Sequence, residues 1–155
     1  MEITGERALS LTREQVWDGL MDTRVLRAAI PGCESVTEEG EGVYHAVVLA
    51  SIGPVRARFK GRIKQRALQK PTRYELDFEG DSGMAGFATG SAVVELAETA
   101  TGGTTLTYRA TSQIGGRLAQ IGARLIDATV ARMSKQFFDR FEEVVTNPAL
   151  LTETA

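Results

Sequence analysis

The sequence is poor in residues that build metal and redox sites, with a single cysteine, Cys33, and a single histidine, His45, among 155 residues. One cysteine excludes a disulfide within the chain and a cysteine cluster for zinc or iron–sulfur binding. One histidine excludes a multi-histidine metal site within one chain. The N-terminus has no secretory signal pattern, and no apolar run approaches the roughly 20 residues that span a bilayer. We therefore expect a cytoplasmic protein without a covalent cofactor.

The chain has little excess of either sign of charge, since the net charge is −2. No overall field therefore favours nucleic acid, and we expect no nucleic-acid partner. The hydrophobic content of 43% and the charged content of 25% are ordinary for a soluble globular protein. A chain of this length forms one domain.

Hydrophobic residues change their spacing three times along the chain. A strand is expected over residues 2–10, followed by helical spacing over 10–22 and 23–30. Thr12 with Gln15 gives a capping-box pattern, and Pro31 stops the second helix. From Cys33 onward the period is close to two, which predicts strands. These strands cover 32–39, 43–52, 55–65, 73–80, 88–98 and 104–114.

Helical spacing returns over residues 117–145. A helix of about 29 residues would be about 43 Å long, and a six- or seven-stranded antiparallel sheet would curl around it and leave a cleft. The order of elements predicts an α+β architecture of the helix-grip type. We expect one domain over residues 1–146 and a short, frayed tail over residues 147–155.

The glycine-rich stretch "GDSGMAGFATG" (80–90) is not a phosphate loop. Phosphate loops follow a strand and open a helix, whereas this stretch ends one predicted antiparallel strand and begins another. It predicts a flexible hairpin at the edge of the sheet, with a bend or bulge at Gly90. Met84 and Phe87 would then form a lip over the apolar cleft.

The strand over residues 55–65 carries five basic residues on one face. They form either a patch for anions or lipid headgroups, or a solvent-exposed face paired with acidic residues of the next strand. The second interpretation is favoured, because Glu75, Asp77 and Glu79 would lie within cross-strand reach.

The opposite faces of the strands combine large apolar residues with alanine and glycine, which would leave volume under the long helix. A cavity of this kind suits a lipophilic ligand. Tyr108 or Arg109 is available as a polar anchor. The residues predicted to bind the ligand are Phe59, Leu76, Phe78, Met84, Phe87, Leu106, Tyr108, Leu118, Ile121 and Leu125.

Catalysis by Cys33 is not expected. A nucleophile needs a nearby base, and the sole histidine, His45, lies on the next strand with no third residue to orient it. A structural cysteine fits the sequence better, and we predict no catalytic residue.

Three segments resemble the CoxG family, which is named for the G subunit of carbon monoxide dehydrogenase and belongs to the START/Bet v 1-like (SRPBCC) superfamily. They are "LRAAIPGCESV" (26–36), "SIGPVRARFKGRI" (51–63) and "GFATGSAVVEL" (86–96), the last followed by "TTLTYRATSQIGGRLAQIGARLI". The similarity extends over nearly the whole chain. It implies the helix-grip fold, with an apolar cavity under the long helix.

The resemblance also implies a non-enzymatic accessory protein of a molybdenum hydroxylase of the carbon monoxide dehydrogenase type. Members of the family are associated with recruiting that enzyme to the membrane and with carrying a lipophilic quinone to it. The expected partners are a non-covalently held quinone or other lipophilic molecule, the dehydrogenase complex and, peripherally, the inner face of the membrane. Members often carry a longer membrane-associating C-terminal extension; with the chain ending at Ala155, we do not expect direct anchoring by one.

Two alternatives remain open at this stage. The protein could be a ligand-free adaptor that docks on the dehydrogenase, or an enzyme, since relatives with this fold include cyclases and aromatases. The scarcity of histidine and cysteine and the lack of paired inward acids weigh against the enzyme.

Overall fold

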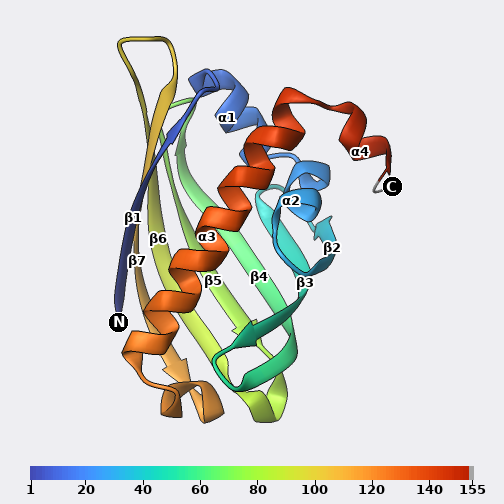
Figure 1. The fold of residues 1–155 in the computed structure, drawn as a ribbon, viewed down its shortest axis with the longest axis vertical. Coiled ribbons are helices and arrows are strands. Elements are labelled where there is room, and N and C mark those ends of the chain that lie inside the picture. The colour runs from blue at the N-terminus through green and yellow to red at the C-terminus, as the bar shows by residue number, and fades with distance from the viewer. Residues whose placement is uncertain (154–155) are drawn as a thin grey trace.

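The computed structural model describes residues 1–153 and shows a curved sheet with helices on its concave side (Figure 1). The elements in chain order are β1 (Glu2–Leu9), α1 (Arg13–Leu20), α2 (Thr23–Ala29), β2 (Cys33–Glu38), β3 (Val43–Ile52), β4 (Val55–Gln69), β5 (Arg73–Asp81), the 3₁₀ turn η1 (Gly83–Ala85), β6 (Phe87–Glu98), β7 (Thr104–Gly115), the 3₁₀ turn η2 (Gly116–Gln120), α3 (Ala123–Thr146) and α4 (Ala149–Glu153).

The sheet has seven strands in the order β1-β7-β6-β5-β4-β3-β2, and every neighbouring pair is antiparallel. Strands β2 to β7 form a meander, and β1 pairs with β7 at the far edge. The long helix α3 crosses the concave face (Figure 1). This arrangement confirms the predicted α+β helix-grip architecture.

The two short helices begin and end where the sequence predicts. Thr12 and Gln15 form the capping box, since the Gln15 N–H donates to Thr12 Oγ1 at 3.2 Å and the Thr12 N–H donates to Gln15 Oε1 at 2.9 Å. Asp22 caps α2 by accepting a hydrogen bond from the Arg24 N–H at 2.9 Å. Helix α2 ends two residues before Pro31, because a residue preceding proline disfavours the helical conformation.

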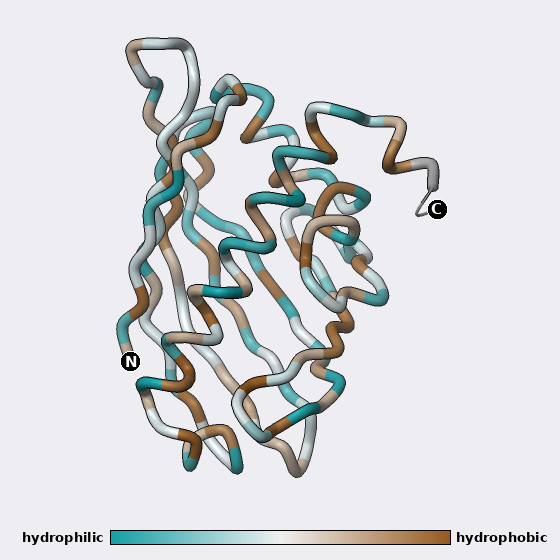
Figure 2. The backbone as a smooth tube through the Cα atoms, viewed as in Figure 1, coloured by the Kyte–Doolittle hydropathy of each residue, from teal (hydrophilic) through white to brown (hydrophobic). Residues whose placement is uncertain are grey.

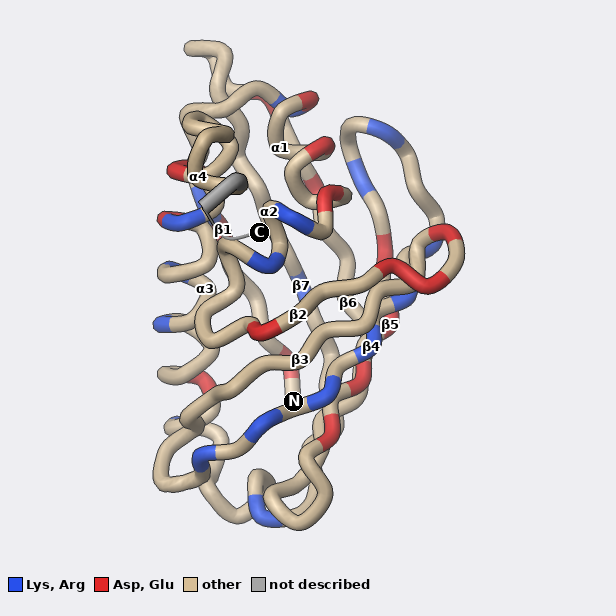
Figure 3. The backbone as a smooth tube through the Cα atoms, turned by 90° about the vertical axis from the view of Figure 1, so that its right-hand side faces the viewer, with Lys and Arg blue, Asp and Glu red and all other residues tan. Residues whose placement is uncertain are grey.

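Polar and apolar residues alternate along the strands (Figure 2), and the basic face of β4 is exposed to solvent. Figure 3 shows basic residues of β4 beside acidic residues of β5. Arg66 contacts both Asp77, at 3.2 Å, and Glu75. Arg58 instead pairs with Glu34 of β2, at 2.6 Å. This face therefore is a solvent-exposed surface crossed by ion pairs.

Helix α3 is shorter than predicted, with 24 residues instead of about 29. The turn η2 precedes it, and Gly122, with φ of +95°, separates the two. Glycine adopts this left-handed conformation without a side-chain clash. Periodicity did not reveal the break, because the apolar spacing of Leu118 and Leu125 fits a continuous helix equally well.

The predicted bend or bulge at Gly90 is wrong. Gly90 pairs in register with Phe78 on one side and Ser112 on the other. A Cβ atom at this position would lie 2.1 Å from the Thr111 carbonyl oxygen and 2.8 Å from the Phe78 ring. The glycine thus lets a ring and a neighbouring backbone approach closely.

The end of the described chain is also more ordered than predicted. Residues 149–153 form α4, and Leu150 and Leu151 pack against the hydrophobic core. The expectation of a frayed tail is therefore wrong for these residues, and its last two positions, 154–155, lie outside the described residues.

The most tightly packed part of the core lies at one end of the molecule, where α1 meets the C-terminal half of α3. Phe141 and Val144 of α3 are fully buried there, together with Val16 of α1 and Leu106 of β7. Gly19 allows this contact, because a Cβ on it would lie only 2.7 Å from the Phe141 ring. The other half of α3 contributes fewer buried side chains.

We expect Phe141→Ala to lower the free energy of unfolding by about 3–5 kcal/mol, because a completely buried ring leaves a void. Phe137→Ala, one turn away, should cost clearly less, because its partly buried ring borders a cavity that already exists. Chemical denaturation of both variants measures the difference. Equal losses would show that the two rings are equally well packed.

Candidate ligand-binding cavities

A cavity of about 390 Å³ lies between α3 and the sheet and extends to α2; we call it the inner cavity. Its wall is predominantly apolar. The lining consists of Leu20, Leu26, Ile30, Pro31, Val36, Tyr44, Ala46, Ile63, Gln65, Tyr74, Leu76, Val94, Leu106, Tyr108, Met133, Ser134, Phe137 and Phe138. This volume falls in the range of small-molecule sites, which are mostly apolar with a few placed polar groups.

The polar groups of the inner cavity are mainly neutral hydroxyls. Tyr74 is buried, and this burial, with a smaller effect of nearby Tyr44, raises the pKa of its phenol. Burial and the Glu38 carboxylate likewise raise the pKa of Tyr44. Both phenols keep their protons at neutral pH; the Tyr44 hydroxyl donates to the Met21 carbonyl oxygen at 3.5 Å, whereas the Tyr74 hydroxyl remains available as a hydrogen-bond donor. Such a donor suits a ligand that carries carbonyl oxygens.

A second cavity, of about 310 Å³, lies farther along α3 toward its N-terminus; we call it the lip cavity. Its wall is almost wholly apolar. The lining consists of Ile3, Ile52, Phe78, Ala88, Tyr108, Ala110, Ser112, Ile114, Leu118, Ile126 and Val130. Of the described residues, Tyr108 lines both cavities.

A larger hollow of about 570 Å³ opens on the outside, between the α2–β2 connection and α3. Its lining mixes Arg27, Gln136 and Arg140 with apolar residues. A lipophilic ligand would leave these polar groups without water, so this hollow fits such a ligand poorly.

Five of the ten residues predicted to bind ligand line the two cavities, and five do not. Those in the lining are Leu76, Phe78, Leu106, Tyr108 and Leu118. Those outside it are Phe59, Met84, Phe87, Ile121 and Leu125. The role of each residue in binding stays a prediction.

The five outside the lining have identifiable positions. Phe87 lies on the outer face of β6, since its neighbour Ala88 points into the lip cavity. Met84 and Leu125 are exposed, with 88% and 48% of their surface accessible. Ile121 contacts the β3–β4 turn, where a Cβ on Gly53 would lie 3.1 Å from it. Phe59 is partly buried opposite Val48.

The glycine-rich hairpin is packed where the sequence suggested flexibility. A Cβ on Gly86 would lie 2.5 Å from the Gly115 carbonyl oxygen, and one on Gly116 would lie 2.7 Å from Gly86. The Phe87 ring lies over Gly115 in the same way. We call η1, η2 and the first turn of α3 the lip. Its glycines allow η1 and η2 to pack backbone to backbone.

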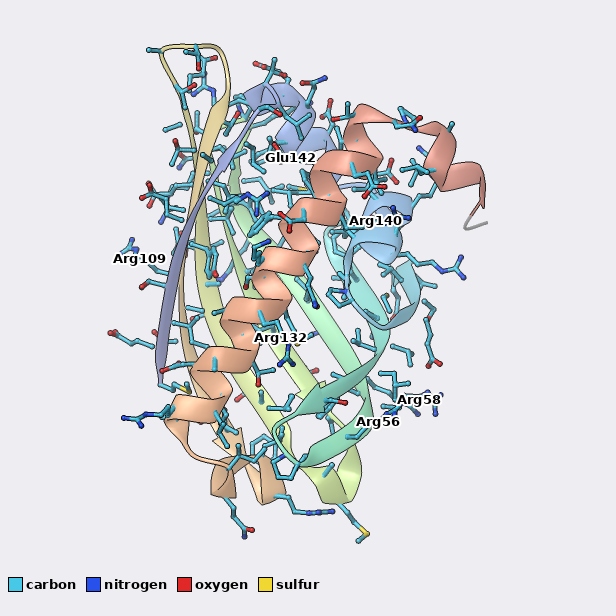
Figure 4. The ribbon with its side chains drawn as sticks, viewed as in Figure 1. Arg56, Arg58, Arg109, Arg132, Arg140 and Glu142 are labelled. Carbon is cyan, nitrogen blue, oxygen red and sulfur yellow. The ribbon has the colours of Figure 1, made fainter. Side chains whose placement is uncertain are left out.

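Of the two predicted polar anchors, only Tyr108 points inward. Figure 4 shows Arg109 on the outer side of the sheet, away from α3, and it lies 3.8 Å from Glu95 there. Alternation along β7 explains the difference, because adjacent residues of a strand face opposite sides. The Tyr108 hydroxyl lies 3.2 Å from Ser134 Oγ on α3.

The structure does not join Cys33 to His45. Cys33 pairs with Val48, whereas His45 pairs with Thr37 and contacts Glu39 near the other end of the β2–β3 hairpin. Burial raises the pKa of the Cys33 thiol. A protonated thiol without a base is a poor nucleophile.

Sequence reasoning missed most of the inner cavity, including Tyr44, Gln65 and the α3 residues Met133 and Ser134. The inward residues Ile126, Met133 and Phe137 form one stripe along α3, whereas the predicted ligand residue Leu125 lies on another face of the helix and is exposed. The alternation of Tyr44 with Ala46, a large residue beside a small one on the inward face, was the available signal.

The comparisons with known proteins agree with this fold. The family model for CoxG, described as the G subunit of carbon monoxide dehydrogenase, matches residues 5–146. None of the curated proteins compared with the chain matches it. Among solved structures, a conserved protein from Geobacillus kaustophilus is 29% identical, with a TM-score of 0.88; the match covers 94% of this chain and 95% of that one.

Other solved structures share the fold at lower identity. A protein from Mycobacterium smegmatis is 15% identical with a TM-score of 0.71, covering 94% of this chain and 91% of that one. The aromatase/cyclase Zhui from Streptomyces sp. R1128 is 13% identical with a TM-score of 0.64, covering 96% and 95%. At these identities, the likeness shows the fold alone.

The raised pKa of Tyr74 predicts how stability depends on pH. The unfolded chain loses the phenol proton near pH 10, while the folded chain keeps it, so the free energy of unfolding falls as pH rises above that value. Between pH 9 and 11 this change amounts to about 1.4 kcal/mol. Denaturation at both pH values should show the wild type losing about that much more than Tyr74→Phe. Equal losses would mean that Tyr74 ionises in the folded protein.

Proposed function

The chain belongs to the CoxG family of carbon monoxide dehydrogenase, and from this premise we propose that it is a non-enzymatic accessory protein that binds a quinone-like lipophilic molecule. Its partner would be a molybdenum hydroxylase of the carbon monoxide dehydrogenase type. The observation that carries the proposal is the inner cavity of about 390 Å³ between α3 and the sheet.

The chemistry of the inner cavity supports a ring-bearing ligand. Phe137, Phe138 and Tyr74 supply aromatic surface, against which a flat ring can stack. Burial of apolar surface contributes about 25 cal/mol per Å² to affinity, before the costs of association. The neutral phenol of Tyr74 can donate to a ring carbonyl oxygen.

A ligand-free adaptor and a cyclase-like enzyme are the alternatives. The adaptor has no use for an open, apolar cavity, which lowers stability unless something fills it. For the enzyme, the likeness to an aromatase/cyclase extends to the fold alone at 13% identity. Cys33 and His45 lie apart, so they do not form a nucleophile–base pair for such chemistry.

The single tryptophan provides a direct test of ligand binding. Trp17 is 4% exposed and packs edge-on against Tyr74, with the ring centroids 5.5 Å apart. Tyr74 lines the inner cavity, so a quinone bound there lies close enough to quench the indole. We expect 2,3-dimethyl-1,4-naphthoquinone to quench Trp17 fluorescence in a saturable manner. Ala46→Leu should weaken this binding about tenfold by filling the cavity.

Ala97→Leu, on the exposed face of β6, is the matched control and should bind as the wild type does. Mass spectrometry of solvent extracts from the purified protein then identifies a retained natural ligand. Unsaturable quenching, or equal binding by both variants, would reject the inner cavity as the site. A protein that binds no quinone but captures the dehydrogenase would be the adaptor.

We further propose that the lip contacts an anionic membrane surface. Of the four exposed large hydrophobic residues among those described, three lie at this end of the molecule: Met84, Phe87 and Leu125. The fourth, Leu68, belongs to the β4–β5 hairpin at the other end, where Lys70 pairs with Asp18 of α1 at 3.4 Å. None of the helices in residues 1–153 has the length and apolar character needed to cross a bilayer.

The charge at this end supports the same proposal. The segments 51–60, 79–89 and 113–132 build it (Figure 1), and they carry more basic than acidic residues, although the whole chain has a net charge of −2. The basic residues are Arg56, Arg58, Lys60, Arg117, Arg124 and Arg132, and the acidic residues are Glu79, Asp81 and Asp127, together with Glu34 of β2, which pairs with Arg58. Apolar side chains within a basic surface are typical of proteins that bind anionic lipids peripherally.

Vesicle sedimentation tests the membrane contact. We expect the wild type to bind vesicles of phosphatidylglycerol and phosphatidylcholine, and to bind phosphatidylcholine alone more weakly. Met84→Asp combined with Leu125→Asp should reduce binding about tenfold or more, because charges replace the apolar contacts. Leu68→Asp is the control for Met84→Asp alone, since each of these single variants adds one negative charge, at opposite ends of the molecule. An equal loss with Leu68→Asp would show that net charge, and not the lip, governs binding.

A further inference from the structure

Tyr108 forms a crossbar between the sheet and α3. It lies midway along β7, where inward positions alternate: Leu106 lines the inner cavity, Ala110 and Ser112 line the lip cavity, and Tyr108 lines both. Its hydroxyl spans the gap and lies 3.2 Å from Ser134 Oγ. The two cavities thus meet at this one side chain.

The crossbar contacts β1, Phe138 and Ser134. Its ring lies directly on the β1 backbone, because a Cβ on Gly5 would fall 2.2 Å from the ring. The Phe138 ring lies nearby, with a centroid separation of 6.4 Å. Cavity space borders the ring on both sides, and a hydrogen bond between two neutral hydroxyls contributes only modestly to stability.

Displacing the ring would join the two cavities. Their volumes of about 390 and about 310 Å³ together come to roughly 700 Å³. The joined space would be chemically uneven. The inner cavity has the phenols of Tyr44 and Tyr74 and the amide of Gln65, whereas Ser112 is the sole polar side chain of the lip cavity besides Tyr108.

We infer that Tyr108 is a specificity-determining residue that selects ligands by the length of their hydrocarbon chain. This inference rests on the proposed function. The ligand is an amphiphile with a polar, ring-bearing head in the inner cavity and a chain that passes Tyr108 into the lip cavity. A short ligand fits without disturbing Tyr108. A long chain must displace the ring and break its hydrogen bond to Ser134.

Two quinone probes separate these cases: 2,3-dimethyl-1,4-naphthoquinone, and 2-methyl-1,4-naphthoquinone with a ten-carbon chain at ring position 3. Both have blocked ring carbons, so neither adds to the Cys33 thiol. Quenching of Trp17 fluorescence reports binding to the inner cavity for each probe. Comparing each variant with the wild type for the same probe removes differences in probe solubility.

Tyr108→Phe keeps the ring and removes the hydroxyl, and Ser134→Ala removes the partner hydroxyl from the other side. Each should tighten binding of the long probe relative to that of the short probe by about two- to tenfold, the value of one net hydrogen bond. The double variant should gain no more than either single variant, because both remove the same interaction.

Several results would overturn this inference. If both probes weaken in Tyr108→Phe, the hydroxyl binds the head directly and is not a barrier. If both variants bind the long probe as the wild type does, Tyr108 does not select by length, although quinone binding stands. If the wild type binds neither probe, the proposed function fails and this inference fails with it. Because Tyr108 and Ser134 lie on different elements, a folding defect in one variant still leaves the other to test the inference.

Discussion

The anchoring of α3 at its C-terminal half is the constraint on which the rest of the structure depends. Phe141 and Val144 are completely buried against α1 and the sheet, and Arg7 of β1 contacts Asp139 at 2.7 Å and Glu142 at 3.4 Å. Glu142 also accepts a hydrogen bond from the Ser10 N–H at 2.7 Å. Because one half of the helix is fixed this firmly, the other half is held above the curved sheet without having to pack tightly against it. The cavities lie in the space that remains.

That space persists because small inward residues alternate with large ones and because the backbone cannot collapse onto it. Ala46, Ala88 and Ala110 leave volume that larger side chains would fill, while the continuous ladders on either side fix the curvature of the sheet. Interiors normally reach close packing, so unfilled volume of this size costs stability. A ligand that binds the folded state alone offsets that cost, and its effect grows with its concentration relative to the dissociation constant. The free energy of unfolding and the fraction of protein that holds ligand then both depend on the volume of the cavities.

Local physics made most of the fold predictable from the sequence. The capping box at Thr12, the stop at Pro31 and the two-residue alternation of the strands each depend on neighbours close in the chain. The failures have a non-local cause. The break at Gly122 and the close contacts of Gly90 depend on which backbone passes nearby, and Phe87 faces outward because of the register of β6. The inner cavity escaped prediction because residues from α1, α2, α3 and six strands line it together, and no segment shows that convergence alone.

Polarity changes in one direction along the interior. Hydrogen-bonding groups gather in the inner cavity, the lip cavity is nearly free of them, and beyond it the lip exposes Met84 and Leu125 among basic side chains. A purely structural void has no reason to be graded in this way. An amphiphile that enters tail-last from a membrane would meet surfaces of matching character throughout, with its head reaching the phenols while its chain remains in apolar surroundings. Tyr108 stands at the point where the character of the wall changes, so one side chain divides the volume and would mark the boundary between the head and the chain of the proposed ligand.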